Sequence, residues 1–170
     1  MSDKVREVKD QRGLFEKVAS YIPGYHGYKE KEIRRETDRL VRSTAVGFLA
    51  KAVDEIRRPL SSLSLSSSDR EGADHLIARM DTVKQRTARA VAGYAGIFDA
   101  VKVKEPKLDK LMELDQSLVE SSKLLYDACK ALNASPVTVE SFRIGASTAT
   151  EKVEEIEGIL DERNAMLVNP

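Results

Sequence analysis

The sequence has few of the residue types that catalysis, metal binding and disulfide formation require. Among its 170 residues it has one cysteine, two histidines and no tryptophan, and its aromatic fraction is 5%. A single cysteine cannot form an internal disulfide, and a core with so few rings has to be built from aliphatic side chains. The composition therefore predicts an aliphatic core in a chain of single-domain length.

The chain also lacks an excess of either charge and any long apolar run. Its 28 basic and 28 acidic residues cancel, so no overall field attracts the molecule to nucleic acid or to an anionic bilayer. The first residues lack the apolar core of a signal peptide, and no later stretch has the length of a membrane span. We therefore expect a cytoplasmic protein without a transmembrane segment.

The motifs of several enzyme classes are absent as well. The Gly-rich phosphate-binding motifs do not occur. A di-iron site in a helical bundle needs two Glu-x-x-His pairs, but Gly72 stands three residues before His75 and Pro23 three before His26. Carboxylates cluster over 99–115, but lysines interleave with them, which is typical of a solvated surface. The sequence thus predicts no catalytic residue, no metal site and no cofactor.

Cys129 is the one candidate thiol nucleophile. It falls between Leu125 and Leu132 on the apolar side of a predicted helix, and neither histidine is close in sequence. A reactive thiolate needs an exposed, electropositive setting. We therefore expect a buried thiol.

Apolar residues recur at helical spacing in five segments. The third of these segments is the clearest, because Leu76, Met80, Val83 and Thr87 begin a four-three seam that continues to Val101. A serine-rich loop is expected over 61–69, with Asp69 as the N-cap of the next helix. The predicted helices are a short one over 13–22 and four long ones over about 28–58, 70–104, 106–133 and 137–167.

Four long amphipathic helices with short connections favour antiparallel neighbours packed at about 20°. We therefore predict an all-α fold, an antiparallel four-helix bundle in which 1–170 form a single domain. The helix over 13–22 is too short to be stable alone, so we expect it to lie across one end of the bundle.

One stretch, YIPGYHGYKEKEIRR over 21–35, crowds aromatic and basic residues around a turn. Pro23 and Gly24 suit the central positions of a type II turn, and Gly27 suits the N-cap of the following helix. Turn donors beside a helix N-terminus, flat rings and cations together form a possible binding surface. The candidate binding residues are Tyr21, Tyr25, His26, Tyr28, Lys29, Lys31, Arg34 and Arg35.

A purely structural interpretation of the same stretch stays open. Over 29–42 the basic residues can pair with acidic residues one turn away on the same helix. The tyrosines can fold over the bundle end with their rings buried and their hydroxyls in water. The stretch is then a hinge between two helices, although a turn alone does not require so many aromatic residues.

Two segments, YIPGYHGYKEKEIRRETDRLVR (21–42) and GYAGIFDAVKVKEPKLDKLMELD (93–115), carry a resemblance. They resemble recurring motifs, of the form YIPGYxGYKEKExRR, of an uncharacterised family of small prokaryotic helical proteins. The resemblance implies a small helical fold and brings no known activity, substrate or cofactor.

The leading hypothesis is a non-enzymatic helical module that binds another protein through the Tyr21–Arg35 surface. Self-association is a second form of the same idea, since the helices have broad apolar faces. The first alternative is a nucleic-acid-associated protein that uses the same basic and aromatic residues, and the second is a metal- or small-molecule-dependent enzyme. Contact with a membrane surface is disfavoured, because the helix over 13–22 is short and carries charges of both signs.

Overall fold

The computed structural model describes residues 31–90, 105–133 and 136–168, and for 31–38, 105–109 and 168 the backbone alone. Within these ranges the structure is helical and contains no strand. The predicted short helix over 13–22 lies outside them. The described elements are α2 (Lys31–Arg57), the 3₁₀ helix η1 (Arg58–Ser61), α3 (Ser67–Arg89), α5 (Glu105–Ala131) and α6 (Val139–Val168).

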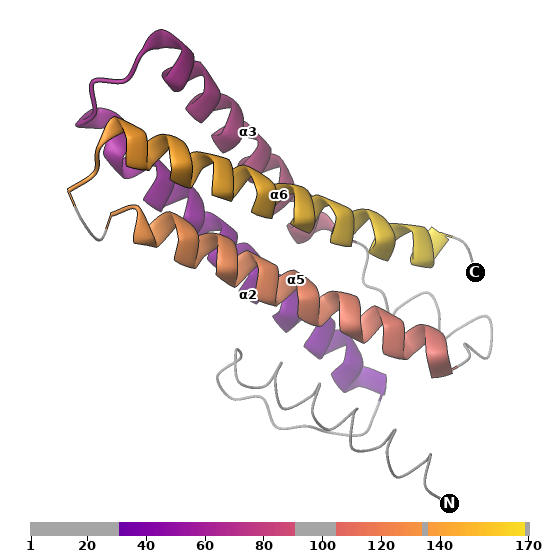
Figure 1. Cartoon of the computed structure of the whole chain (residues 1–170). Coiled ribbons are helices and arrows are strands. Elements are labelled where there is room, and N and C mark those ends of the chain that lie inside the picture. The colour runs from indigo at the N-terminus through magenta and orange to yellow at the C-terminus, as the bar shows by residue number, and fades with distance from the viewer. Residues whose placement is uncertain (1–30, 91–104, 134–135, 169–170) are drawn as a thin grey trace, which may run out of the picture.

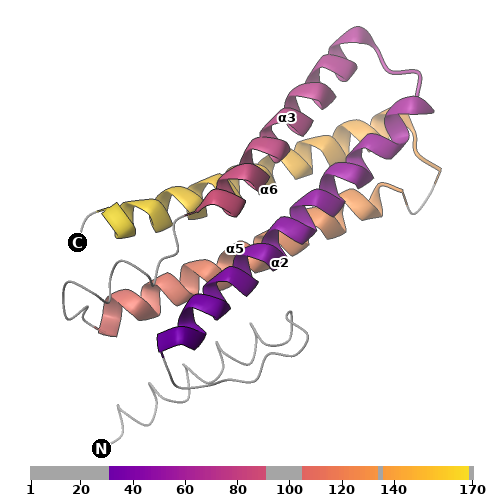
Figure 2. The ribbon, with the colours of Figure 1, turned by 180° about the vertical axis from the view of Figure 1, so that it is seen from behind.

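The four α-helices pack against one another around a shared interior, which confirms the predicted helical bundle. α2 lies beside α3 and α5, and α6 lies beside the same two helices (Figure 1). α2 and α6 therefore occupy opposite corners of the bundle, as do α3 and α5. The same arrangement is visible from behind in Figure 2.

α2 and α5 run side by side in the same direction. Phe48 of α2 contacts Tyr126 of α5, with ring centroids 6.1 Å apart. About two turns further along both helices, the Asn133 side chain donates to the carboxylate and to the backbone carbonyl of Glu55, at 2.9 and 3.0 Å. Contacts that advance together along both helices require a parallel pair.

α3 and α6 form a second parallel pair. Asp69 pairs with Arg143 near the start of both helices, and Arg86 pairs with Asp161 near the end of both. Consecutive helices still alternate in direction, so the bundle is antiparallel along the chain (Figure 1). The short connections make α2 and α3 antiparallel neighbours, and likewise α5 and α6. Residues 90–104 form a longer connection, which when extended can span up to about 50 Å, enough to join α3 and α5 at opposite corners.

The observed helix boundaries follow from local chemistry. α2 ends at Arg57 because Pro59 cannot continue an α-helix, and η1 follows. α3 begins inside the expected 61–69 loop. Its N-cap is Ser66 rather than Asp69, because the Ser66 hydroxyl accepts the backbone N–H of Asp69 at 3.1 Å. Within the predicted 70–104 helix, Ala90 has a ψ of 132°, which ends α3 at Arg89.

The core is aliphatic, as the composition predicts. Much of the predicted seam of α3, from Leu76 through Met80 and Val83 to Thr87, is buried. Cys129 is buried among these side chains, which confirms its predicted position. Buried residues of the other helices include Ala45, Leu49, Val53 and Ile56 of α2, Leu118 and Leu125 of α5, and Phe142, Val153, Ile156 and Leu160 of α6.

Gly145 allows α6 to approach the end of α5 closely. A methyl group built at Gly145 would lie 2.7 Å from Cγ of Leu132 and nearer still to one of its methyl carbons. Gly158, on the same helix, has open space at the corresponding position. The two glycines therefore differ in what a side chain there would contact.

We expect Gly145→Ala to destabilise the protein by about 1–2 kcal/mol, because the displacement of Leu132 outweighs the gain in helix propensity. Gly158→Ala is the matched control and should add up to about 1 kcal/mol. Denaturant unfolding measures both, and Leu132→Ala should remove the difference between them. Equal effects of the two glycine substitutions would contradict the close approach.

Candidate functional site

The structure describes part of the surface predicted from the 21–35 stretch. Lys31, Arg34 and Arg35 lie in the first two turns of α2. The other predicted site residues, Tyr21, Tyr25, His26, Tyr28 and Lys29, lie outside the described residues. Whether the stretch is a binding surface or a hinge thus stays a prediction.

The two ends of the bundle are named here by a residue at each. α2 and α5 begin at the Lys31 end, where α3 and α6 finish (Figure 1). α3 and α6 begin at the Ser66 end, where α2 and α5 finish (Figure 2). The first turns of α2 therefore lie at the same end as the first turns of α5.

A buried ion pair joins α5 to α6 near the Lys31 end. Nε of Arg163 lies 2.8 Å from Oδ1 of Asp115, and the two side chains are 0% and 5% exposed. The desolvation of two such charges is costly and is offset only when they remain together with good geometry. The pair therefore constrains how α5 and α6 align.

Other buried or half-buried polar groups are hydrogen-bonded within the bundle. The Thr87 hydroxyl donates to the carbonyl of Val83. Gln116 donates to Glu120 at 2.7 Å, while its side-chain oxygen has no hydrogen-bond partner among the described atoms. An Arg42 guanidinium N–H donates to the carbonyl of Ala90 and joins the middle of α2 to the end of α3. Buried polar groups thus accompany the aliphatic core, and Ser121 and Ser122 in the middle of α5 are buried as well.

Removing one partner of the buried pair should be strongly destabilising. We expect Arg163→Met to lower the free energy of unfolding by about 3–5 kcal/mol, because the Asp115 carboxylate stays buried without its cation. The double variant Asp115→Leu, Arg163→Met should recover most of that loss. Thermal and denaturant unfolding measure both variants, and a double variant less stable than Arg163→Met would show that the charge is not the cause.

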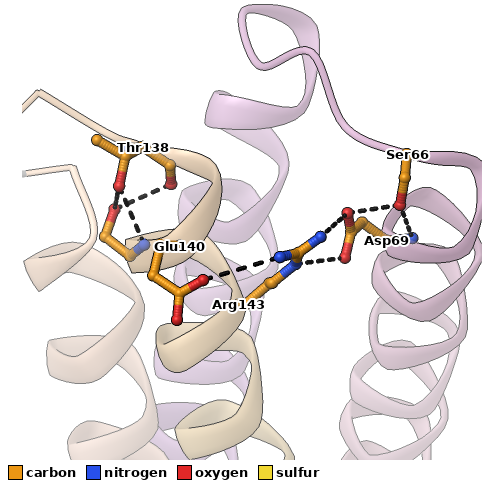
Figure 3. A network of polar contacts seen from close by, with 6 residues as sticks. Ser66, Asp69, Thr138, Glu140 and Arg143 are labelled. Atoms are coloured by element: carbon orange, nitrogen blue, oxygen red, sulfur yellow. Dashed lines mark hydrogen bonds and ion pairs between the residues drawn. The ribbon is translucent and has the colours of Figure 1, made fainter.

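A second polar cluster lies at the Ser66 end. Arg143 of α6 extends to Asp69 of α3 (Figure 3), with Nε and Nη2 at 2.8 and 2.9 Å from the two carboxylate oxygens. Glu140 lies one turn before Arg143 at 3.7 Å, and Ser66 donates to Asp69 at 2.6 Å. Arg143 and Ser66 together hold the pKa of the Asp69 carboxyl well below its usual range. Thr138 and Ser141 bond to each other and cap the start of α6.

A hollow of about 230 Å³ lies between the starts of α3 and α6. Its walls include Leu76, Phe142 and Ala146 on the apolar side, and Asp69 and Arg143 on the polar side. Asp69 and Arg143 come from different helices, so the ion pair between them joins the two helices that line the hollow.

The Cys129 thiol is chemically suppressed by its surroundings. Burial raises its pKa to about 12, and the nearby Glu55 carboxylate acts in the same direction. The fraction of thiolate at neutral pH is therefore much smaller than for an ordinary cysteine. A nucleophilic role in the native state is inconsistent with this environment.

We expect an aromatic disulfide reagent at about pH 8 to label Cys129 only as the protein unfolds. The native labelling rate should be at least a hundredfold below that in denaturant, since burial excludes the reagent and suppresses the thiolate. Cys129→Ala supplies the blank. Native labelling as fast as that of the unfolded chain would contradict the assigned burial.

Neither a metal-binding cluster nor a membrane-spanning helix occurs among the described residues. No group of three or more histidine, cysteine, aspartate or glutamate side chains within them could bind a metal ion. None of the four described α-helices is both long and apolar enough to cross a membrane.

The buried pair and the Asp69–Arg143 pair escape prediction from periodicity. Arg163 occupies the heptad position between Leu160 and Leu167, where an apolar residue is expected. An arginine at an expected apolar position indicates a buried ion pair. Its partner, Asp115, lies between Leu114 and Leu118 in the sequence. No comparable signal identifies Arg143, because exposed helices commonly carry arginine.

Comparison of the chain with protein-family models, with curated proteins and with solved structures finds no match. The resemblance of 21–42 and 93–115 to a family of small prokaryotic helical proteins therefore stays a prediction.

Proposed function

We propose that this protein is a non-enzymatic helical module that binds another protein through the surface over 21–35. The observation that carries the proposal is the position of Lys31, Arg34 and Arg35 in the first two turns of α2. The N-terminus of a helix has a partial positive charge, so basic residues there are disfavoured for helix stability. The same two turns also contain Glu32 and Glu36, so the basic excess is small and favours a partner with acidic side chains among its contacts.

The attachment of α2 to the bundle supports the same proposal. From Val41 onward α2 contributes a continuous buried face that includes Ala45, Leu49 and Ala52. The basic turns thus extend from a helix whose position is fixed by the core. A surface built on a rigid element loses less conformational entropy on binding than a free segment does.

The use of reactive side chains within the bundle argues against an enzyme. The Ser122 hydroxyl donates to the carbonyl of Leu118, and that of Ser121 donates to Glu155. Thr87 bonds within its own helix, and Cys129 has its thiolate suppressed by burial. These groups stabilise helices and helix contacts, which is typical of a structural scaffold.

The test compares the wild type with the triple variant Tyr25→Ala, His26→Ala, Tyr28→Ala in affinity capture from native lysate. We expect the variant to lose at least tenfold in recovery of the specific partner, because the aromatic contacts are removed. A second variant, Lys31→Glu, Arg34→Glu, Arg35→Glu, should lose an acidic partner as well. Circular dichroism checks that each variant is folded.

Leu124→Ala, Ile144→Ala is the matched control, because these are exposed large apolar side chains of α5 and α6, outside the proposed surface. It should recover the partner as the wild type does. Undiminished recovery by both folded site variants would contradict the proposal. Absorbance at 260 nm, with heparin retention that falls steeply with salt, would instead support the nucleic-acid alternative.

A further inference from the structure

The contact between α3 and α6 contains a series of partly exposed ion pairs. Arg79 of α3 lies 2.8 Å from Glu157 of α6 and 3.4 Å from Glu154. Asp69 pairs with Arg143 closer to the Ser66 end. Coulombic attraction between exposed charges is screened as salt concentration rises, whereas apolar packing is not weakened in this way. This contact therefore depends on ionic strength more than the apolar contact of α2 with α5.

The first two turns of α3 have little apolar attachment to the bundle. Of residues 67–75, only Ala73 is buried. From Leu76 onward the inward face of α3 is buried regularly, at Leu76, Ile77, Met80 and Val83. Segments with few buried apolar contacts open at a lower free energy than the core they adjoin.

The Asp69–Arg143 pair is the polar link between these two turns and α6. Arg143 is 52% exposed and Asp69 14%, so the pair lies at the surface. Both residues line the hollow of about 230 Å³. Beyond them the lining includes Leu76 and Phe142, which are almost completely buried. Separation of the pair would give water and ligands access to these apolar side chains.

We propose that Ser67–His75 form a flap over this hollow, which the Asp69–Arg143 ion pair closes and which opens when that pair is broken. Among the described ion pairs between α3 and α6, this is the one in which α3 provides the acid and α6 the base. In the others, Arg79 and Arg86 of α3 pair with acidic residues of α6. The flap lies between two anchors, the buried Leu65 in the connection before it and Leu76 after it, and its two turns move between them. Opening exposes an apolar surface that includes the Phe142 ring while the remainder of the bundle stays packed.

Amide hydrogen exchange on the full chain tests the flap. The informative amides are those of 70–75, which bond carbonyls of the preceding turn, as Arg70 does with Ser66 at 3.0 Å. Arg143→Gln breaks the pair while the Ser66 cap of α3 remains. We expect exchange of these amides to become about fivefold faster in this variant, from the range measured for exposed ion pairs.

Lys152→Gln is the matched control, because it removes one base from α6 whose described partner, Glu155, lies on the same helix. It should leave exchange over 70–75 unchanged. Exchange over 118–125 of α5 is the internal reference and should be the same in all three proteins. Raising salt from about 0.05 M to about 0.5 M, which shortens the Debye length roughly threefold, should accelerate exchange over 70–75 in the wild type but not in Arg143→Gln.

Wild-type exchange over 70–75 that does not respond to salt would overturn the proposal. Equal acceleration over 70–75 and 118–125 in Arg143→Gln would do the same, because it would show global destabilisation. The salt series on the wild type decides the question even if Arg143→Gln does not fold.

Discussion

The parallel contact between α2 and α5 is the constraint on which the other helix positions depend. The Phe48–Tyr126 contact and the Asn133–Glu55 hydrogen bonds fix the axial alignment of the two helices. Short connections then attach α3 to α2 and α6 to α5 in the reverse direction. Once the first pair is aligned, α3 and α6 are brought side by side with their charged residues in register.

Polar groups specify this arrangement more closely than the apolar core does. An aliphatic core tolerates small shifts of one helix along another, because one leucine can replace another in a seam. The Arg163–Asp115 pair does not, since sliding α6 against α5 would separate two buried charges. Gly145 adds a steric limit, because a side chain at that position would displace the Leu132 side chain. The core supplies most of the stabilisation, and these few contacts select one alignment.

Much of the fold could be predicted from the sequence, because apolar periodicity is local information. Leu76, Met80, Val83 and Thr87 define the inward face of α3 whatever that helix packs against. The identity of its neighbours is not local, because residues 90–104 are long enough to place α5 at either an adjacent or an opposite corner. Ser66 rather than Asp69 caps α3 because the cap is decided by one hydrogen bond. For the candidate site, the sequence identified residues but not their arrangement. Most of these residues precede α2 and lie outside the described residues.

The side-by-side placement of like-directed helices makes each end of the bundle electrically uneven. At the Lys31 end, the positive poles of α2 and α5 lie side by side and the negative pole of α6 lies beside α5, whereas α3 ends further back, where Ala90 accepts from Arg42. At the Ser66 end the polarity is reversed. A simple alternating bundle would place opposite poles on every adjacent pair and cancel them locally. In this bundle like poles lie side by side on α2 and α5 and on α3 and α6, so the backbone contribution to the field is uneven across each tip.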